Sequence, residues 1–322
     1  MRAFITALTI YLSACSLHAI EYHVATVGAD ENPGSKKKPF LTIQHAAVLA
    51  QPGDTITVHE GVYRERVNPP RGGTSDDKRI VYQAAPGENV AIKGSEIVKG
   101  WEKLENIAWT VTLPNSFFGE FNPYADLIHG DYMFTNKLSQ HTGQVYINGK
   151  PLVEAATIEE LDASTDKLFW FGEVKNGKTT LWGRFNGMNP NEQTVEINVR
   201  QSVFYPSKEK NNYITVRGFE MSQAAANWAP PTAEQIGLIG THWSKGWIIE
   251  NNTISHSRCV GITLGKFGDE FDNTYAQDSQ GWNKGVDQAI DYGWTKKTVG
   301  HHRVANNTIS HCGQAGIVGS PG

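Results

Sequence analysis

The stretch Trp247-Ile-Ile-Glu-Asn-Asn-Thr-Ile-Ser-His256 returns further along the chain as Arg303-Val-Ala-Asn-Asn-Thr-Ile-Ser-His311. Each copy is followed by a cysteine and then by a short apolar run, Cys259-Val-Gly-Ile and Ala315-Gly-Ile-Val. A fainter copy, Ile214-Thr-Val-Arg-Gly-Phe-Glu-Met221, comes earlier. The three copies indicate one structural unit that the chain repeats.

A short apolar strand, an asparagine pair and a second short apolar strand are typical of one coil of a parallel β-solenoid. Each coil pairs with the next, so equivalent residues stack roughly 4.8 Å apart. Asparagine tolerates the left-handed backbone of a tight bend, and stacked amides can bond along the ladder. One coil cannot bury its apolar face alone, so several must stack. We therefore predict an all-β solenoid in which Ile254 lies on Ile309.

The charge and aromatic content of the chain limit the kinds of molecule that it is expected to bind. The chain has 322 residues, a net charge of −4 and a pI of about 6.3, which gives no reason to expect a nucleic acid. Its 9 Trp, 11 Tyr and 13 Phe suit either a packed core or stacking against sugars. Repeated histidines and turn acids are explained by ladder positions and solvated turns, so we expect no metal and no cofactor.

Residues 1–19 have the features of an export signal, with Arg2 ahead of an apolar run too short to span a membrane. Two cleavage sites stay open. Leu12-Ser-Ala-Cys15 resembles a lipobox, which would lipidate Cys15, whereas cleavage after Ala19 would release a soluble protein. Either way we expect an exported protein that is periplasmic, extracellular or an outer-membrane lipoprotein. Cys259 and Cys312 could form a disulfide, although buried thiols need no such bond.

The rest of the chain divides into three regions. Residues 20–96 should hold a capping helix over Thr42–Ala50 and the first coils. Residues 97–205 lose the coil spacing and show hairpin signals, including Asn148-Gly149 and Asn176-Gly177, which predict an inserted antiparallel β-sandwich. Residues 206–322 return to coils, which are interrupted by long excursions at about 223–245 and 266–300. Excursions on one side of a solenoid are where binding sites usually lie.

Six stretches make the sequence similar to glycoside hydrolase family 120. The resemblance implies a right-handed parallel β-helix of the pectin lyase-like kind with a flanking β-sandwich, and retaining hydrolysis of xylosides by an Asp nucleophile and a Glu acid/base. The stretches, which together sample nearly the whole chain after the signal, are Glu21–Ala25, Gly53–Glu65, Leu113–Tyr124, Val195–Arg200, Trp228–Ala233 and Trp243–Glu250.

The resemblance gives this chain no catalytic residue. In the family the catalytic Asp and Glu lie on coils after the stretch that matches Cys312–Gly319, and this sequence ends at Gly322. Glu250 and its repeat partner Ala305 are not two acids either. We therefore expect the N-terminal portion of a xylan 1,4-β-xylosidase-like enzyme with little or no activity. The alternative is a short natural protein whose last coil is covered by dimerisation.

Five residues are candidates for sugar binding. An aromatic ring beside a carboxylate and an amide suits a sugar face and its hydroxyls, and an indole held near Pro230-Pro231 suits stacking. Packing roles are the competing interpretation for all of them. The candidates are Phe118, Glu120, Asn122, Trp228 and Trp243.

Three functions remain open at this point. The first is a β-xylosidase-like hydrolase acting on xylosides or xylo-oligosaccharides derived from xylan. The second is a polysaccharide lyase, another activity found on β-helices, which would need a calcium cluster and a Lys or Arg base. The third is a carbohydrate-binding surface protein without catalysis.

Overall fold

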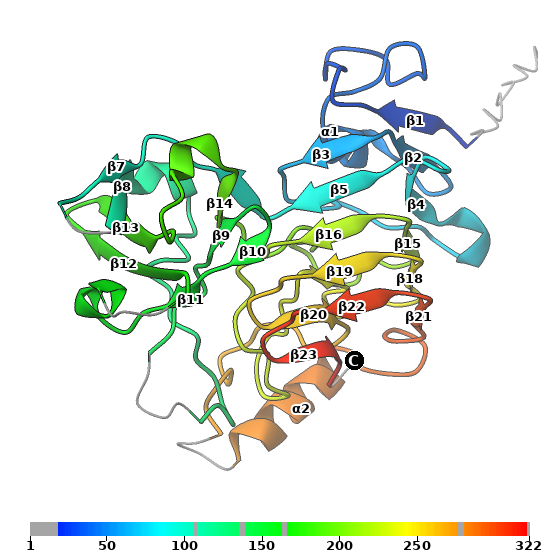
Figure 1. Ribbon diagram of the computed structural model, residues 1–322. Coiled ribbons are helices and arrows are strands. Elements are labelled where there is room, and N and C mark those ends of the chain that lie inside the picture. The colour runs from blue at the N-terminus through cyan, green and yellow to red at the C-terminus, as the bar shows by residue number, and fades with distance from the viewer. Residues whose placement is uncertain (1–18, 106–107, 135–138, 163–165, 276–279, 321–322) are drawn as a thin grey trace, which may run out of the picture.

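The computed structural model describes residues 19–105, 108–134, 139–162, 166–275 and 280–320. The chain is all-β, with two α-helices among these residues, and strands that lie far apart in sequence stack side by side (Figure 1). Among these residues, no helix combines the length and the apolar character needed to cross a bilayer.

Three parallel sheets form the body of the molecule, and successive passes of the chain add one strand to a sheet. We call each such pass a rung. The first sheet contains, in order, β1 (Glu21–Val24), β2 (Thr55–Val58), β4 (Ile80–Ala84), β15 (Ile214–Arg217), β18 (Ile248–Glu250) and β21 (Arg303–Ala305). The second contains β3 (Gly61–Tyr63), β5 (Val90–Lys93), β16 (Glu220–Ser222), β19 (Thr253–Ser255) and β22 (Thr308–Ser310). The third contains β17 (Ile239–Gly240), β20 (Val260–Thr263) and β23 (Ala315–Val318).

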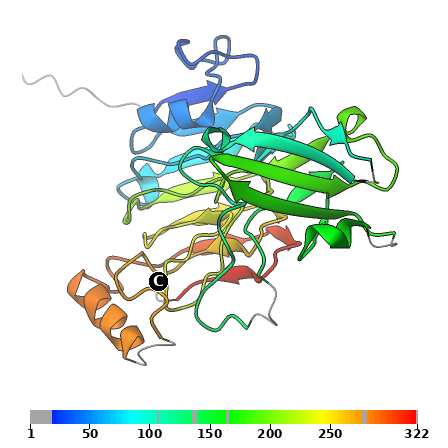
Figure 2. The ribbon, with the colours of Figure 1, turned by 90° about the vertical axis from the view of Figure 1, so that its left-hand side faces the viewer.

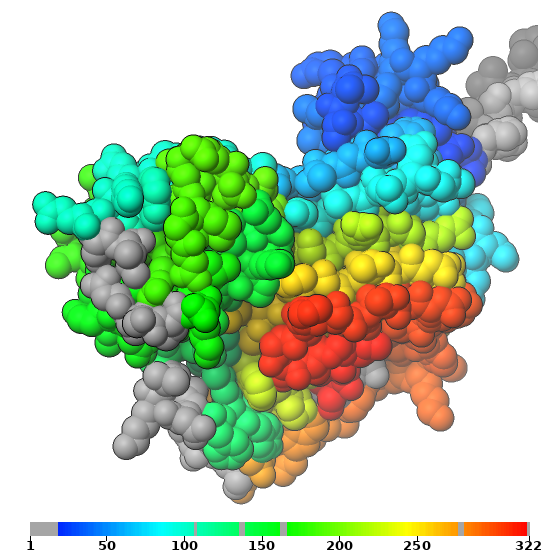
Figure 3. Space-filling view, in the orientation of Figure 1, coloured from blue at the N-terminus to red at the C-terminus, as the bar shows by residue number. Residues whose placement is uncertain are grey.

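The repeat read from the sequence is the stacking register of the rungs. Ile254 pairs with Ile309 in parallel, and Ile309 packs against the same apolar cluster that buries Ile254. Glu250 lies beside Ala305, as the repeat required. The predicted stacking is therefore confirmed at these positions, and the space-filling view shows the rungs as successive bands (Figure 3).

The asparagine pairs do two different jobs at the bend. Asn251 and Asn306 take the left-handed backbone, with φ of 57° and 56°. Asn252 is buried, and its Nδ2 donates to Asn307 Oδ1 at 3.0 Å and to the Val216 carbonyl at 3.1 Å. One side chain therefore ties three successive rungs together.

The predicted helix near the N-terminus is present as α1 (Ile43–Leu49). Thr42 caps it, because its hydroxyl accepts a hydrogen bond from the His45 amide. Ile43, Ala46 and Ala47 are buried in the core of the rungs. The helix therefore adds its apolar face to the end of the core that holds β1 and β2.

Two further sheets lie beside the rungs (Figure 2). They share a second apolar core. Their pairings are antiparallel except for β11 with β12. Both predicted Asn-Gly hairpins are present, with left-handed φ at Asn148 and Asn176. One sheet contains β10 (Lys150–Pro151), β9 (Val145–Ile147), β14 (Val195–Asn198) and β6 (Ser95–Ile97). The other contains β11 (Val153–Glu154), β12 (Phe169–Lys175), β13 (Lys178–Arg184), β8 (Ala108–Pro114) and β7 (Glu102–Lys103).

Helix α2 (Gly281–Asp291) was not foreseen from the sequence. It lies in the long excursion between β20 and β21 and buries only Gly281, Gly285 and Ala289. Trp282, Val286, Ala289 and Ile290 have the i, i+4, i+7, i+8 spacing of an amphipathic helix, so the sequence carried a helical signal that was overlooked. Short 3₁₀ turns occupy Asp76–Lys78, Asn115–Phe118, Ile158–Asp162 and Pro190–Glu192.

The two cysteines of the rungs are free thiols. Cys259 is buried and Cys312 is half-buried. Burial raises the pKa of Cys259 to about 12. The structure thus has the buried-thiol arrangement rather than the disulfide.

The asparagine ladder yields a stability prediction. We expect Asn252→Ala to lower the free energy of unfolding by about 2–3 kcal/mol, because it leaves buried backbone groups without partners. Asn251→Gly keeps the left-handed bend and should change the value by less than about 0.5 kcal/mol. Urea unfolding of both variants tests this, and equal effects would contradict the ladder.

His302 gives a pH prediction. The Trp247 amide donates to His302 Nδ1 at 3.1 Å, so that nitrogen must stay unprotonated in the fold. Burial, with a smaller contribution from His301, lowers the pKa of His302 to about 4. The unfolded chain binds the proton near pH 6.5, so stability should be full above that pH and fall by about 2–3 kcal/mol towards pH 4.

Thermal unfolding at several pH values measures this loss. His302→Asn should flatten the stability profile between pH 6.5 and pH 4. His301→Asn, which alters an exposed neighbouring ring, serves as the matched control and should keep most of the slope. A profile unchanged by His302→Asn would show that another group causes the acid sensitivity.

Candidate functional site

We call the segment from β6 to β14, which forms the two further sheets, the insertion. A cleft of about 350 Å³ lies where the insertion meets two excursions from the rungs. Its residues come from the loop after the 3₁₀ turn Asn115–Phe118 and from the segments that follow β14, β16 and β20. Three carboxylates, three amides, an imidazole and an indole surround it, a set that suits an uncharged ligand rich in hydroxyls. The lining residues are Phe121, Asp126, His129, Gln201, Asn227, Trp228, Ala233, Glu234, Asp272 and Asn273.

Trp228 is held firmly at the edge of this cleft. Its backbone amide donates to the Asn227 side chain at 2.7 Å, and its indole Nε1 donates to the Asp131 carbonyl at 3.0 Å. The ring is half-buried, and Pro230 and Pro231 stiffen the segment that follows. An indole fixed in this way loses little entropy when a sugar ring stacks on it.

Asn227 links the excursion to the insertion. Its Nδ2 donates to Asp126 Oδ2 at 3.2 Å and to the Leu127 carbonyl at 3.1 Å. Its Oδ1 accepts the His129 amide at 3.1 Å. Asp126 also accepts the Thr142 hydroxyl at 3.0 Å. The Asp126 carboxylate is therefore fixed in place, half-exposed, with its charge available to hydroxyl donors in the cleft.

Glu234 is oriented from the rung side. The Tyr205 hydroxyl donates to Glu234 Oε1 at 2.9 Å, and His242 Nε2 lies 3.4 Å from the same atom. Burial and the Glu234 charge together raise the pKa of Tyr205 well above its usual value. Tyr205 therefore remains a hydrogen-bond donor to Glu234 throughout the pH range in which the protein would work.

Asp272 sits over a buried cation. Lys266 is 3% exposed and forms ion pairs with both Asp269, at 2.8 Å, and Asp272. Asp272 Oδ2 accepts the Glu234 backbone amide at 3.0 Å. Lys266 thus fixes the position of Asp272 in one wall of the cleft. The two aspartates neutralise the positive charge of Lys266.

A second hollow, of about 490 Å³, adjoins the cleft and shares His129 and Asn273 with it. We call it the outer hollow. Its remaining lining residues are Gly130, Asp131, Tyr132, Met133, Phe134 and Tyr275.

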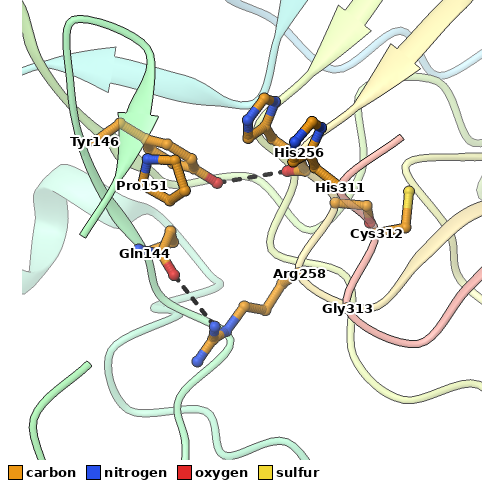
Figure 4. Close-up of a pocket in the computed structure, with 9 residues that line it drawn as sticks. Gln144, Tyr146, Pro151, His256, Arg258, His311, Cys312 and Gly313 are labelled. Carbon is orange, nitrogen blue, oxygen red and sulfur yellow. Dashed lines mark hydrogen bonds between the residues drawn. The ribbon is translucent and has the colours of Figure 1, made fainter. Parts of the chain in front are cut away.

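A separate pocket of about 290 Å³ lies at the seam between insertion and rungs (Figure 4). His256 and His311 stack there with ring centroids 4.8 Å apart and planes within 1°, as their repeat positions require. The Arg258 guanidinium donates to Gln144 at 3.2 Å and is paired with Glu154. The stacked rings are ladder positions and the cation is already neutralised, so we favour the cleft as the functional site.

Of the five predicted sugar-binding residues, the structure brings only Trp228 to the cleft. Phe118 packs inside the second core, and Asn122 bonds to Thr179 and to the Tyr124 amide. Trp243 is fully buried against Phe267, so neither buried ring offers a face to a ligand. Glu120 is exposed and does not line the cleft. Cys15, the lipidation candidate, lies outside the described residues.

Most residues that line the cleft were not predicted from the sequence. Asp126 and His129 sit just after the 113–124 stretch that drew attention, and Asn227 is the residue next to Trp228. Asp272 lies in the excursion at 266–300, and its ion pair with Lys266 becomes visible only in the structure. These residues meet only in three dimensions, so no spacing in the sequence identifies them together.

Comparison with known proteins tests the resemblance that the sequence suggested. The glycoside hydrolase 120 insertion domain matches residues 98–197, which hold the two extra sheets except for β6 and the last residue of β14. A solved structure, the complex of XylC with xylose, is 47% identical, covers 93% of this chain and superposes with a TM-score of 0.89. The resemblance to glycoside hydrolase family 120 is confirmed. The chain spans 51% of the length of XylC.

More distant matches add little about the site. A solved structure titled glycoside hydrolase has a TM-score of 0.56 at 12% identity, covering 92% of this chain and 74% of its own, which supports the fold alone. Residues 26–68 match a family described as protein of unknown function (DUF1565). The uncharacterized protein YwoF of Bacillus subtilis is 39% identical over 75 residues, 23% of this chain and 16% of YwoF.

The buried lysine of the cleft wall can be tested by substitution. Lys266→Met removes the partner of two aspartates, one of which is 2% exposed, so we expect the free energy of unfolding to fall by about 3–5 kcal/mol. The matched control is Lys296→Met, an exposed lysine of the same excursion, with an expected change within about 0.5 kcal/mol. Chemical unfolding gives both values, and a small effect at Lys266 would refute the ion-pair assignment.

Proposed function

We propose that this chain is part of an exported glycoside hydrolase that acts on xylosides or xylo-oligosaccharides. The observation that carries the proposal is the likeness to XylC, which was solved with xylose bound, over 93% of the chain at 47% identity. The cleft supports it from this chain's own residues, since an indole and ordered carboxylates and amides suit the faces and hydroxyls of a neutral sugar.

The architecture proposed with this function is a right-handed parallel β-helix carrying an inserted β-sandwich. The three parallel sheets with one register support the helix. The two extra sheets around a common core support the sandwich. Right-handedness is the usual hand of crossovers between parallel strands.

Such a scaffold suits retaining hydrolysis. That reaction needs two carboxyl groups about 5–5.5 Å apart. Equivalent side chains on neighbouring rungs come close to this spacing, as the 4.8 Å between the His256 and His311 rings shows for this chain. The resemblance puts the family's acid pair on rungs after the stretch matching Cys312–Gly319. We therefore assign no residue of this chain to nucleophilic attack or proton transfer, and give the cleft residues the tasks of binding and orienting the sugar.

Export is part of the proposal and rests on residues 1–19. The Ile20 amide donates to the buried Asp54 carboxylate at 2.8 Å, and β1 begins at the next residue. These contacts support cleavage after Ala19, because they include the residue that would then become the N-terminus. Mass spectrometry of the exported protein distinguishes an Ile20 terminus from a lipid-modified Cys15.

Sugar binding and turnover test the proposal together. We expect the chain to bind xylose, and Asp126→Asn and Trp228→Ala to weaken that binding at least tenfold, since each removes a fixed contact in the cleft. Glu120→Gln, which alters an exposed carboxylate outside the cleft, should leave the affinity unchanged. Isothermal titration calorimetry gives the dissociation constants, and circular dichroism checks that the variants fold.

Product analysis separates the competing functions. Release of xylose from xylo-oligosaccharides supports the hydrolase. Unsaturated products would support a polysaccharide lyase, and binding without turnover by the full-length protein would favour a carbohydrate-binding surface protein. Failure of the chain to bind any xylose-containing sugar would overturn the proposal.

A further inference from the structure

The outer hollow exposes aromatic rings that no packing requirement explains. The side chain of Phe134 is 92% exposed, and those of Tyr132 and Tyr275 are 49% and 38% exposed. The two tyrosine rings lie against each other, with centroids 5.3 Å apart and planes inclined by 39°. Exposed aromatic side chains gathered in a concavity mark a binding surface more often than a structural one.

The backbone under these rings is strained. Tyr132 has φ of 61°, a left-handed conformation that is unfavourable for a bulky side chain. Gly130 has φ of 155°, and a Cβ there would lie 2.8 Å from the Trp228 ring. Strain of this kind persists only where surrounding contacts impose it, and it concentrates at functional sites.

Asp131 supplies those contacts. It is 5% exposed, and its Oδ2 accepts the Thr232 hydroxyl at 2.7 Å and the Tyr275 amide at 3.0 Å. Its carbonyl accepts the Trp228 indole N–H, and its amide donates to Asn273 at 3.1 Å. The Asp131 carboxylate therefore ties its own loop, which carries Tyr132, to Thr232 and to the segment that carries Tyr275, while the backbone carbonyl of Asp131 holds the indole of the cleft.

The cleft and the outer hollow are neighbours, since His129 and Asn273 line both. We propose that the outer hollow is a second sugar subsite, in which the next residue of a xylo-oligosaccharide packs on Tyr132 and Tyr275 while the first occupies the cleft. The inference rests on the proposed function and deepens it: the site selects oligosaccharides over xylose and simple xylosides.

A sugar is the occupant that fits this surface. The apolar face of a pyranose packs on aromatic rings, and its hydroxyls need nearby polar partners. The hollow offers His129 and Asn273 at the side shared with the cleft. The competing occupant is a second copy of the chain, whose docking on the three exposed rings would be independent of any sugar.

Binding as a function of chain length tests the subsite. The full chain is titrated with xylose, xylobiose and xylotetraose by isothermal titration calorimetry. We expect affinity to rise about tenfold or more from xylose to xylotetraose. The double variant Tyr132→Ala/Tyr275→Ala should lose this gain and keep the affinity for xylose. Phe117→Ala, which removes an exposed ring of the insertion that does not line either cavity, is the matched control and should keep the gain.

The outcomes separate the two proposals. Absence of binding to every sugar overturns the proposed function. Xylose binding with no gain for longer sugars, or a gain that survives the double variant, overturns the subsite alone. Sedimentation of wild type and double variant in the absence of sugar covers the rival occupant: a dimer that the double variant abolishes, with length dependence unchanged, would assign the rings to a second copy of the chain.

Discussion

Parallel pairing between successive rungs is the constraint on which the rest of the structure depends. It sets one spacing for every equivalent position, so the apolar residues stack into a single core and the polar residues stack at the bends. Asn252 holds successive rungs together at the bend between two strands. Its amide bonds to the rung before and the rung after, where the backbone turns and cannot supply its own partners.

The cleft also depends on the contacts between the rungs and the insertion. Glu196 is 1% exposed on β14 and is paired with Arg64 at 2.7 Å and Lys93 at 2.9 Å, while Gln223 donates to its other oxygen at 2.9 Å. Burial alone would raise the pKa of Glu196, but these donors outweigh it and hold the pKa below its usual value. The charged form is thereby locked across the seam, and the insertion loop that carries Asp126 and His129 is held against the excursion that carries Trp228.

The repeated features could be predicted from sequence because one physical rule acts on every copy. The register of Ile254 with Ile309, the left-handed Asn251 and the two Asn-Gly hairpins all follow from local residue preferences. The cleft could not be predicted in that way. Asp126 and Asp272 lie on chain segments that share no sequence repeat, and only the fold brings them together. Trp243 and Phe118 were predicted to bind sugar, but their rings are buried in separate cores. The identity of an aromatic residue in the sequence does not show whether its ring is buried or accessible in the fold.

The way the insertion joins the rungs has a consequence for how the chain acquires its structure. It leaves through β6 and returns through β14, and these two strands pair with each other, Ser95 opposite Asn198. Next to this stem, β5 must find β16 although a whole extra core separates them along the chain. Closing so large a loop is entropically costly unless its ends are already joined. Pairing of β6 with β14 should therefore precede the pairing of early rungs with late ones. The insertion thus takes part in folding and also forms one wall of the cleft.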